Sequence, residues 1–226
     1  MGIFITLEGI DGSGKTTVSK ILKDRLDIEG YRVTLIKEPT ETLLGKFIRK
    51  EILGADKENS SFMKRLDGKT FAMASLFLFS ADRTLHIDEI KAKLNISDIV
   101  ICDRFIDSTY AYQAAGLNST DEDKELKNFI LSVNEFILKQ KNFAIGRTYI
   151  FDLEPEAALN RLNGRADKLD GFDSRSTDFF NSVRNNYLYL SEKYKNRIKI
   201  IDASGVPENI AGEVADDIKK LAGSLL

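Results

Sequence analysis

One short segment near the start of the chain constrains the fold more than any other feature. Residues 9–16 read Gly-Ile-Asp-Gly-Ser-Gly-Lys-Thr, which fits the G-x-x-x-x-G-K-[ST] pattern of a phosphate-binding loop. The apolar run Ile3–Glu8 precedes it and a helical pattern over Thr16–Glu29 follows it. This is the strand, loop and helix context that the pattern requires. The segment therefore predicts an α/β sheet that binds a nucleotide phosphate where the first strand ends.

The residue types in this loop suit the binding of phosphate. Glycine lets backbone N–H groups converge on phosphate oxygens, and the following helix directs its positive dipole end at the same anion. Lys15 is expected to reach the β- and γ-phosphates, and the Thr16 hydroxyl is expected to bind Mg²⁺. The expected phosphate-binding residues are Gly9, Asp11, Gly12, Ser13, Gly14, Lys15, Thr16 and Thr17.

Short β-rich runs alternate with longer helical patterns, which is typical of a parallel sheet covered by helices on both faces. The expected strands are Ile3–Glu8, Arg32–Ile36, Asp98–Cys102, Thr148–Leu153 and Ile198–Asp202. The expected helices are Thr16–Glu29, Leu43–Leu53, Lys69–Leu94, Ser108–Ala115, Asp121–Gln140, Pro155–Leu162, Ser176–Lys195 and Pro207–Leu221, with Ser108 and Ser176 as N-caps. The sequence shows no internal repeat or linker-like composition, so we expect one domain over residues 1–226.

Composition excludes several classes of protein. Hydrophobic residues make up 42% of the 226 residues, which is enough for a core, and the formal net charge of −2 provides no overall basic field for nucleic acid. The longest apolar runs fall far short of the roughly 20 residues of a membrane helix. The single cysteine, Cys102, lies in an apolar run and is expected in the core. We expect a cytoplasmic protein that binds neither membranes nor nucleic acid.

Further charged residues follow the third expected strand and the second. Asp103 and Arg104 emerge at the carboxyl edge of a parallel strand, where open α/β sheets bind ligands. Asp103 there could hold the Mg²⁺ shell and Arg104 a second phosphate, or the two could form a plain ion pair at the strand end. Arg49, which follows Glu38 by one helix, is either a phosphate clamp or a solvated charge on a helix face.

The long expected helix Lys69–Leu94 carries Phe79 and Arg83 four residues apart, and therefore on one face. An aromatic plane beside a planar cation suits stacking on a nucleobase and hydrogen bonding to its edge, although a core position for Phe79 is the alternative. His86 on the same helix is interpreted as a surface or structural residue.

The segment Asn163–Thr177 interrupts two helical patterns with Gly, Asp and Ser among several cations. It predicts a charged lid at about residues 163–177, bordered or filled by Arg161, Arg165, Lys168 and Arg175. Solvated charges are the alternative interpretation of these cations. The sequence has no Asn-Lys-x-Asp motif for reading a guanine base, which disfavours a GTPase.

Taken in order, these motifs resemble a known family. GIDGSGKTT (Gly9–Thr17), Glu38-Pro39, FSADR (Phe79–Arg83), Asp103-Arg104-Phe105, STYAYQ (Ser108–Gln113) and the arginine-bearing lid are similar to the thymidylate kinases, which phosphorylate dTMP to dTDP. The resemblance covers nearly the whole chain. It implies a three-layer P-loop NTPase fold of the α/β class, in which helices flank a five-stranded parallel sheet and a short lid is present. It also implies ATP and dTMP as substrates, Mg²⁺ as cofactor, and a homodimer.

The resemblance assigns roles by position. Arg104 matches the arginine that holds the dTMP phosphate, Phe79 the ring that stacks on thymine, and Arg83 the group that hydrogen-bonds its carbonyl edge. The other matching positions are Asp11 and Tyr112 near the 3′-hydroxyl, Thr109 and Gln113 at the N3 side of the ring, and Glu38 and Arg49 in the monophosphate pocket. The implied catalytic residues are Lys15, Arg104, Arg161 and Arg165, and the implied metal ligands are Thr16 and Asp103.

Two positions depart from the most familiar pattern of this family. The loop reads Asp11-Gly12-Ser13 and lacks the arginine that other members carry there, which points to a lid that supplies the basic residues. Pro39-Thr40-Glu41 stands where many bacterial members have Pro-Gly-Gly, so the form of the loop beside the substrate is open.

Two other functions remain open from the sequence. A kinase for another nucleotide or for a deoxynucleoside is one, and the latter would need an acid to deprotonate a 5′-hydroxyl, for which Glu38 is the candidate. A binding module that uses ATP as a switch, without transferring phosphate, is the other. The dense arginines of the lid and the residues Tyr112 and Gln113 disfavour the switch.

Overall fold

A computed structural model of the chain contains one parallel sheet with the strand order β2-β3-β1-β4-β5. The strands are β1 (Ile3–Glu8), β2 (Val33–Lys37), β3 (Ile99–Asp103), β4 (Arg147–Asp152) and β5 (Ile198–Asp202). The structure describes residues 2–54, 63, 66–118, 120–164 and 177–223. All five expected strands are confirmed, with shifts of one residue at some ends.

The expected helices are confirmed as well. They are α1 (Lys15–Ile28), α2 (Leu43–Glu51), α3 (Gly68–Leu94), α4 (Ile106–Gln113), α5 (Asp121–Gln140), α6 (Pro155–Asn163), α7 (Thr177–Lys193) and α8 (Pro207–Gly223). The N-cap expected at Ser108 is wrong, because α4 begins at Ile106 and Phe105 occupies the cap position. Arg104 turns the chain sharply with φ 71°, so the helix starts almost directly after β3. The cap expected at Ser176 lies outside the described residues.

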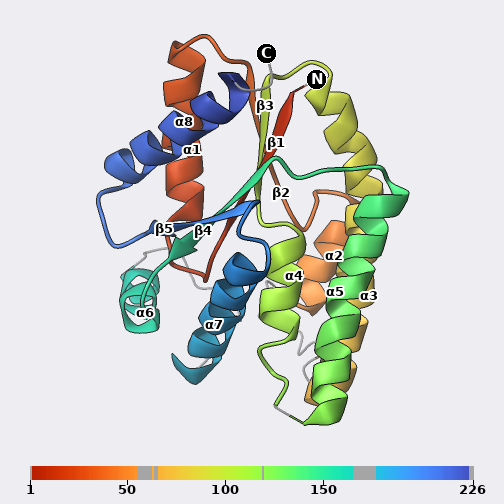
Figure 1. Cartoon of the computed structure of the whole chain (residues 1–226). Coiled ribbons are helices and arrows are strands. Elements are labelled where there is room, and N and C mark those ends of the chain that lie inside the picture. The colour runs from red at the N-terminus through yellow and green to blue at the C-terminus, as the bar shows by residue number, and fades with distance from the viewer. Residues whose placement is uncertain (1, 55–62, 64–65, 119, 165–176, 224–226) are drawn as a thin grey trace.

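Helices cover both faces of the sheet, as Figure 1 shows, with α1 and α8 on one side and α3, α4 and α5 on the other. The central strands β1 and β3 are mostly apolar and are buried along almost their whole length, because helices cover both faces of the sheet. Phe4 and Cys102 pack with Ile87 and Ile90 of α3, while Ile5 belongs to the larger core that includes α1. Cys102 is buried in the core, as the sequence predicts.

The strand order determines which loops meet. Leu7 of β1 pairs with Asp103 of β3, so the loop that follows Glu8 lies beside Asp103 and Arg104 at one edge of the sheet. This edge is formed by the carboxyl ends of the strands, where ligands bind in α/β sheets of this kind. Among the described helices, none has the length and apolar character needed to cross a membrane.

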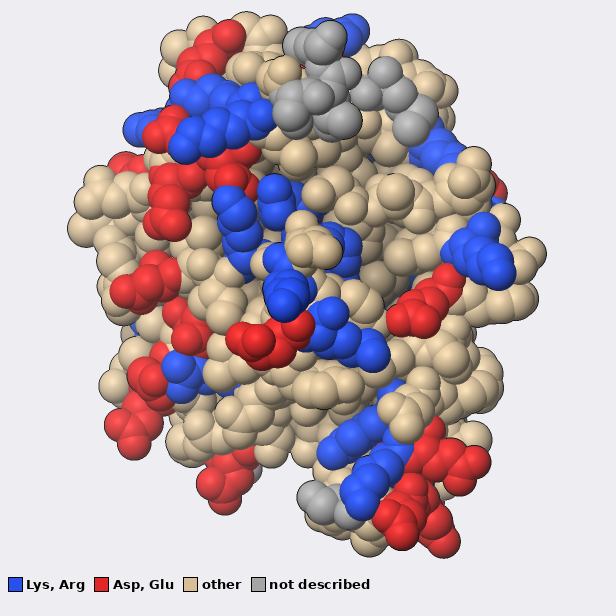
Figure 2. All heavy atoms as spheres, viewed as in Figure 1, with Lys and Arg blue, Asp and Glu red and all other residues tan. Residues whose placement is uncertain are grey.

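Charges of both signs are interspersed on the face of the molecule shown in Figure 2. This distribution agrees with the formal net charge of −2. Anionic ligands must therefore be held by cations placed locally, and the carboxyl edge of the sheet is where such cations gather.

Candidate active site

The loop between β1 and α1 has the backbone form of a phosphate-binding loop. Gly12 and Gly14 have φ values of 82° and 91°, a region that side chains with a Cβ atom rarely adopt. A Cβ atom on Gly12 would also lie 2.5 Å from the carbonyl oxygen of Ala158. Gly14 is the N-cap of α1 and has no side chain to occupy the helix N-terminus. The backbone N–H groups of the first turn of α1 therefore remain available to an anion.

Lys15 lies at the centre of this loop. Its Nζ donates to the carbonyl oxygens of Gly9 at 3.0 Å and Ile10 at 2.9 Å. Burial lowers the pKa of Lys15 to about 8, and the positive charge of Arg104 contributes in the same direction. The ammonium group is thus desolvated in advance, which strengthens its attraction to a phosphate that enters the loop.

Thr16 and Asp103 meet beside the loop, as the sequence predicts for a metal site. The Thr16 hydroxyl donates to Oδ2 of Asp103 at 2.7 Å. In the described part of the chain, no three His, Cys, Asp or Glu side chains come together as a metal-binding group. A hydroxyl and one carboxylate fit Mg²⁺, because this ion commonly takes its remaining oxygen ligands from water and substrate phosphates.

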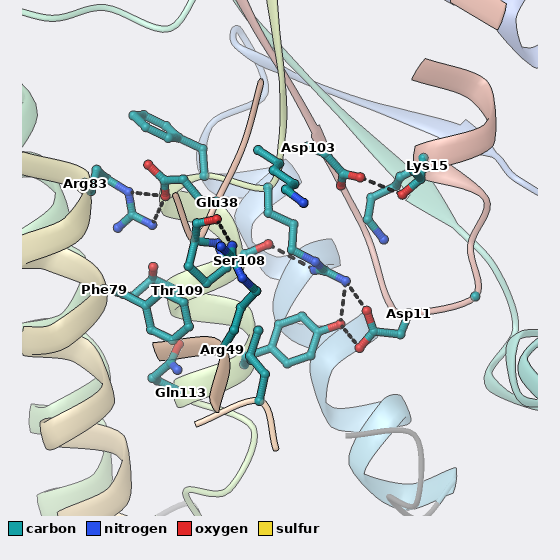
Figure 3. A pocket seen from close by; sticks show the side chains of 18 of the residues that line it. Asp11, Lys15, Glu38, Arg49, Phe79, Arg83, Asp103, Ser108, Thr109 and Gln113 are labelled. Carbon is teal, nitrogen blue, oxygen red and sulfur yellow. Dashed lines mark hydrogen bonds and ion pairs between the residues drawn. The ribbon is translucent and has the colours of Figure 1, made fainter. Parts of the chain in front are cut away.

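Arg104 joins the phosphate loop to α4 by hydrogen bonds to Asp11 and Ser108, both of which Figure 3 labels. Its Nη2 donates to Oδ1 of Asp11 at 2.5 Å and to the Tyr112 hydroxyl at 3.0 Å, and the Tyr112 hydroxyl donates to Oδ2 of Asp11 at 3.0 Å. Burial alone would raise the pKa of Asp11, but Arg104 and Lys15 hold that pKa below its usual value. Arg104 therefore forms its ion pair with Asp11. The plain ion pair with Asp103 at the end of the strand, which was the alternative from the sequence, is not what the structure shows.

Arg83 is buried, with 1% of its surface exposed, and is held by a carboxylate from the end of β2. Its Nε and Nη2 donate to Oε2 of Glu38 at 3.0 and 2.7 Å, and its guanidinium lies 5.1 Å from the centre of the Phe105 ring. His86 Nδ1 lies 3.1 Å from the other oxygen of Glu38. Of the two interpretations of His86, the surface position is wrong and the structural role is confirmed.

Arg49 is not a solvated charge on a helix face. Its Nη1 donates to the carbonyl oxygen of Pro39 at 2.5 Å, and its Nη2 donates to the carbonyl oxygen of Thr40 at 2.7 Å. The same loop is held from α3 by Asp82, which accepts bonds from the Thr40 N–H at 2.8 Å and hydroxyl at 2.6 Å. Sequence reasoning missed Asp82, although a carboxylate directly after the mostly apolar stretch Phe71–Ala81 was a signal that it has a partner.

The cavity at this edge of the sheet extends from the phosphate loop to α3 and α4. It has a volume of about 360 Å³ and is lined at its far end by Phe79, Thr109 and Gln113. The Thr109 hydroxyl and Oε1 of Gln113 are buried, and among the described residues neither has a hydrogen-bond partner. Phe79 contacts a small apolar cluster under α2 and also lines the cavity. Its stacking on a nucleobase stays a prediction. Thr109 and Gln113 both line the cavity, and buried polar groups without partners are those that a polar ligand can satisfy.

A buried carboxylate that sequence reasoning missed lies under Arg104. Glu8, the last residue of β1, accepts a bond from the Phe105 N–H at 2.7 Å and another from the Ser108 hydroxyl. Burial and the neighbouring Asp107 raise the pKa of Glu8 to about 7. An acid at the end of an otherwise apolar strand was the available signal.

The cations assigned to the lid are only partly described. Arg161 lies in the last turn of α6 and donates to the carbonyl oxygens of Ala203 at 2.9 Å and Ser204 at 3.3 Å. Its guanidinium comes within 4.0 Å of where a Cβ of Gly14 would lie, so it borders the phosphate loop. Arg165, Lys168, Arg175 and most of the expected lid lie outside the described residues.

A phosphate loop at the end of β1, an acid and an arginine at the end of β3, and a base-sized cavity beyond them define a nucleotide kinase of the P-loop class. The family model for thymidylate kinase matches residues 7–214. With this match over most of its length, the chain belongs to the thymidylate kinase family, and the resemblance described from the sequence is confirmed.

Individual thymidylate kinases are also similar to this chain over most of its length. A thymidylate kinase of Bifidobacterium longum (strain DJO10A) is 35% identical over 223 residues, which cover 98% of this chain and 99% of the relative. One from Exiguobacterium sibiricum is 34% identical over 96% of this chain and 94% of its own. One from Ligilactobacillus salivarius is 38% identical over 90% of each chain.

Proposed function

We propose that this site transfers the γ-phosphoryl group of ATP to the 5′-phosphate of dTMP, giving dTDP and ADP. Family membership supports the reaction. The observation that carries it concerns two residues that line the cavity: the Thr109 hydroxyl and Oε1 of Gln113 are buried, and the described part of the chain offers neither a hydrogen-bond partner. These can bond the edge of a pyrimidine ring that stacks on Phe79, whereas a phosphate alone would not reach them.

Arg104 and Lys15 are assigned to the two phosphate groups that must approach each other. The acceptor oxygen of a nucleoside monophosphate is already anionic at neutral pH, so transfer needs charge compensation rather than a general base. Lys15 serves the donor phosphates from within its loop, and Arg104 serves the acceptor phosphate from the end of β3. Asp11 and Tyr112 hold the Arg104 guanidinium between the two sides.

Mg²⁺ would be held by Thr16 and Asp103, with the donor phosphates and water as its other ligands. When bound, the ion would neutralise negative charge on the donor phosphates. Thr16 and Asp103 already lie in contact, so the chain presents both oxygen donors from one place at the carboxyl edge of the sheet.

The assignment of Arg161 and Arg165 to the transition state remains part of the proposal. Arg161 borders the phosphate loop and supports it. Arg165, the lid at about residues 163–177 and the single-domain organisation stay predictions from the sequence. The single cysteine, buried in the core, accords with the cytoplasmic location that we propose.

The deoxynucleoside kinase is disfavoured by the surroundings of Glu38. A base that deprotonates a 5′-hydroxyl needs a free carboxylate oxygen facing the substrate. Oε2 of Glu38 accepts both bonds from Arg83, and Oε1 lies against His86. The carboxylate therefore holds Arg83 in place.

We also propose that the protein is a homodimer, joined through an apolar strip on α3 and α5. The strip consists of Met73 and Phe77 on α3 and Phe129 and Phe136 on α5, all exposed. The Phe77 and Phe129 rings touch at 6.3 Å between centres, so the strip is continuous across the two helices. A contiguous exposed apolar surface is typical of a self-complementary interface between two copies.

The test is ADP production from Mg·ATP with dTMP, dUMP, thymidine, CMP, AMP or GMP as the acceptor, with Lys15→Ala as the blank. Turnover should be greatest with dTMP and absent in the blank. Preference for thymidine would instead establish a deoxynucleoside kinase. ATP binding without turnover on any acceptor would establish the switch module and contradict the proposal.

A further inference from the structure

Glu8 lies beneath the reacting groups without lining the cavity. It ends β1 and its side chain is buried among β1, β3, α4 and α7. Its Oε1 accepts the bond from the Phe105 N–H at 2.7 Å. Its Oε2 accepts from the Ser108 hydroxyl and from the Tyr187 hydroxyl, the latter at 3.1 Å. A buried carboxylate costs several kcal/mol to desolvate, so three donors directed at one such group call for an explanation.

The same hydroxyl groups contact Arg104. Its Nη1 donates to the Ser108 oxygen at 3.1 Å and to the Tyr187 oxygen at 3.3 Å. A hydroxyl has one hydrogen to donate, and the Ser108 and Tyr187 oxygens also lie 2.8 Å from each other, a contact in which either could be the donor. Both hydrogens are donated to Glu8 when its carboxylate is charged, because a carboxylate is the stronger acceptor. The lone pairs of both oxygens are therefore left to accept from Arg104, which carries only donors.

Glu8 also fixes the backbone around Arg104. The residue after Arg104 donates its N–H to Glu8, while the Arg104 N–H donates to the carbonyl oxygen of Leu7 at 3.0 Å. Between these two bonds Arg104 has φ 71°, a conformation that a residue with a side chain adopts only when its surroundings hold it. Leu7 and Glu8 together clamp this turn at the end of β3.

We propose that Glu8 is a positioning residue for phosphoryl transfer, acting through Ser108, Tyr187 and the turn at Phe105 to aim the Arg104 guanidinium at the acceptor phosphate. This inference rests on the role of Arg104 given under the proposed function. Glu8 touches neither substrate, and its effect reaches the reaction only through Arg104.

The test is a double-mutant cycle between Glu8→Gln and Arg104→Ala, with the dissociation constant of dTMP measured by titration calorimetry so that no turnover is needed. Glutamine keeps the size of the side chain but directs an N–H₂ group at the hydroxyls or at the Phe105 N–H. Glu8→Gln should weaken dTMP binding about ten-fold in the wild-type background, and should leave ATP binding within about two-fold. In the Arg104→Ala background, Glu8→Gln should change dTMP binding less than two-fold.

Ser108→Ala and Tyr187→Phe each remove one of the two hydroxyl groups that connect Glu8 to Arg104. They test the same inference if Glu8→Gln does not fold. Each should weaken dTMP binding about three- to ten-fold, again only when Arg104 is present. The matched controls are Ser191→Ala on α7, whose hydroxyl bonds the Leu188 carbonyl, and Tyr149→Phe on β4, whose hydroxyl bonds Asp217 of α8. Both controls should leave dTMP binding unchanged.

An equal loss of dTMP affinity in both backgrounds would overturn the inference, because Glu8 would then act independently of Arg104. Unchanged affinity in Glu8→Gln, or in Arg104→Ala itself, would overturn it as well, while leaving dTMP kinase activity as a separate result. Failure of the wild-type protein to use dTMP in the ADP assay would instead contradict the proposed function.

Discussion

At the scale of single residues, the site and its surroundings contain polar and charged side chains whose burial lowers the stability of the folded protein. The Thr109 hydroxyl is buried without a hydrogen-bond partner among the described residues. Glu8 is a carboxylate inside the protein. Such groups reduce stability, and proteins retain them where a ligand or a reaction uses them. Substitutions at these positions should therefore separate stability from function.

Thr109→Val should stabilise the protein and weaken substrate binding. Valine matches threonine in shape and removes the unpaired hydroxyl, so the free energy of unfolding should rise by about 1 kcal/mol. The affinity for dTMP should fall about ten-fold, since one hydrogen bond to the base is lost. Urea denaturation and calorimetry measure the two effects.

Thr148→Val is the matched control. Thr148 is also buried, but its hydroxyl bonds Thr6 at 2.6 Å and Arg197 at 2.6 Å. This substitution should lower the free energy of unfolding and leave dTMP affinity unchanged. A loss of stability in Thr109→Val would show that its hydroxyl is satisfied within the protein.

The buried carboxylate of Glu8 predicts a pH dependence of stability. Its folded pKa of about 7 lies above the ordinary 4.5, because burial and Asp107 oppose ionisation more than Ser108, Arg104 and the Phe105 N–H favour it. The folded protein therefore holds this proton more tightly than the unfolded chain. The contribution of Glu8 to stability is complete below about pH 4.5 and is lost as the pH rises through about 7.

Glu8→Gln should remove this loss. Relative to wild type, the variant should gain about 3 kcal/mol in free energy of unfolding between pH 4.5 and pH 8, as measured by urea denaturation at each pH. This gain is measured relative to the difference between the two proteins at pH 4.5. An identical pH dependence in the two proteins would show that the pKa of Glu8 is not raised in the folded state.

At the scale of elements, the sequence predicted nearly every strand and helix, because apolar runs, glycine and proline positions and the phosphate loop are local signals. The boundary of α4 was missed because Arg104 has φ 71°, which is set by bonds to β1 rather than by neighbours in sequence. Glu8 and Asp82 were missed for the same reason. A carboxylate receives its role from donors on other elements, and a single sequence does not show which elements those are.

The loop before α2 shows this dependence. Asp82 on α3 accepts bonds from the Thr40 N–H and hydroxyl, and the Thr42 hydroxyl lies 3.3 Å from it. Thr42 in turn caps α2 through the Gly45 N–H. Asp82 of α3 thus holds the loop at Pro39-Thr40-Glu41, and through Thr42 it also supports the N-terminus of α2.

Asp82→Asn should loosen this loop. The amide replaces one acceptor oxygen with a donor, so the free energy of unfolding should fall by about 2 kcal/mol, and amide hydrogen exchange over residues 40–45 should accelerate. Arg49 bonds the same loop, so the KM for dTMP should rise as well. Asp88→Asn is the control, because Asp88 lies on the same helix but is exposed, where it pairs with Lys141. Unchanged exchange over residues 40–45 would remove Asp82 from this role.

At the scale of the whole molecule, the exposed apolar strip on α3 and α5 lies on the side of the sheet opposite α1 and α8 (Figure 1). Phe77, 51% exposed, lies against Phe129 in this strip. A dimer formed here would bury the outer surface of the helix that carries Phe79 and Arg83 on its inner side. The two nucleotide cavities would then be connected through α3.

Phe77→Asp should therefore convert the protein to a monomer. A charge in a buried apolar interface costs several kcal/mol, and it would be introduced once from each copy. Light scattering coupled to size-exclusion chromatography gives the mass. Ile28→Asp is the control, because Ile28 is 87% exposed at the end of α1 on the other side of the sheet. A monomeric wild-type protein, or a dimeric Phe77→Asp variant, would contradict this interface.

The pairing of β1 has a consequence for how the chain is made. Its two neighbours are β3 and β4, with Ile3 beside Ile99 and Ile5 beside Arg147. The ribosome releases the phosphate loop well before either of the two strands that hold it in place. Until β3 and β4 emerge, the apolar strand β1 lacks both of its neighbours and is a site for chaperones or for misassembly. The phosphate loop is thus synthesised long before it can acquire its binding function.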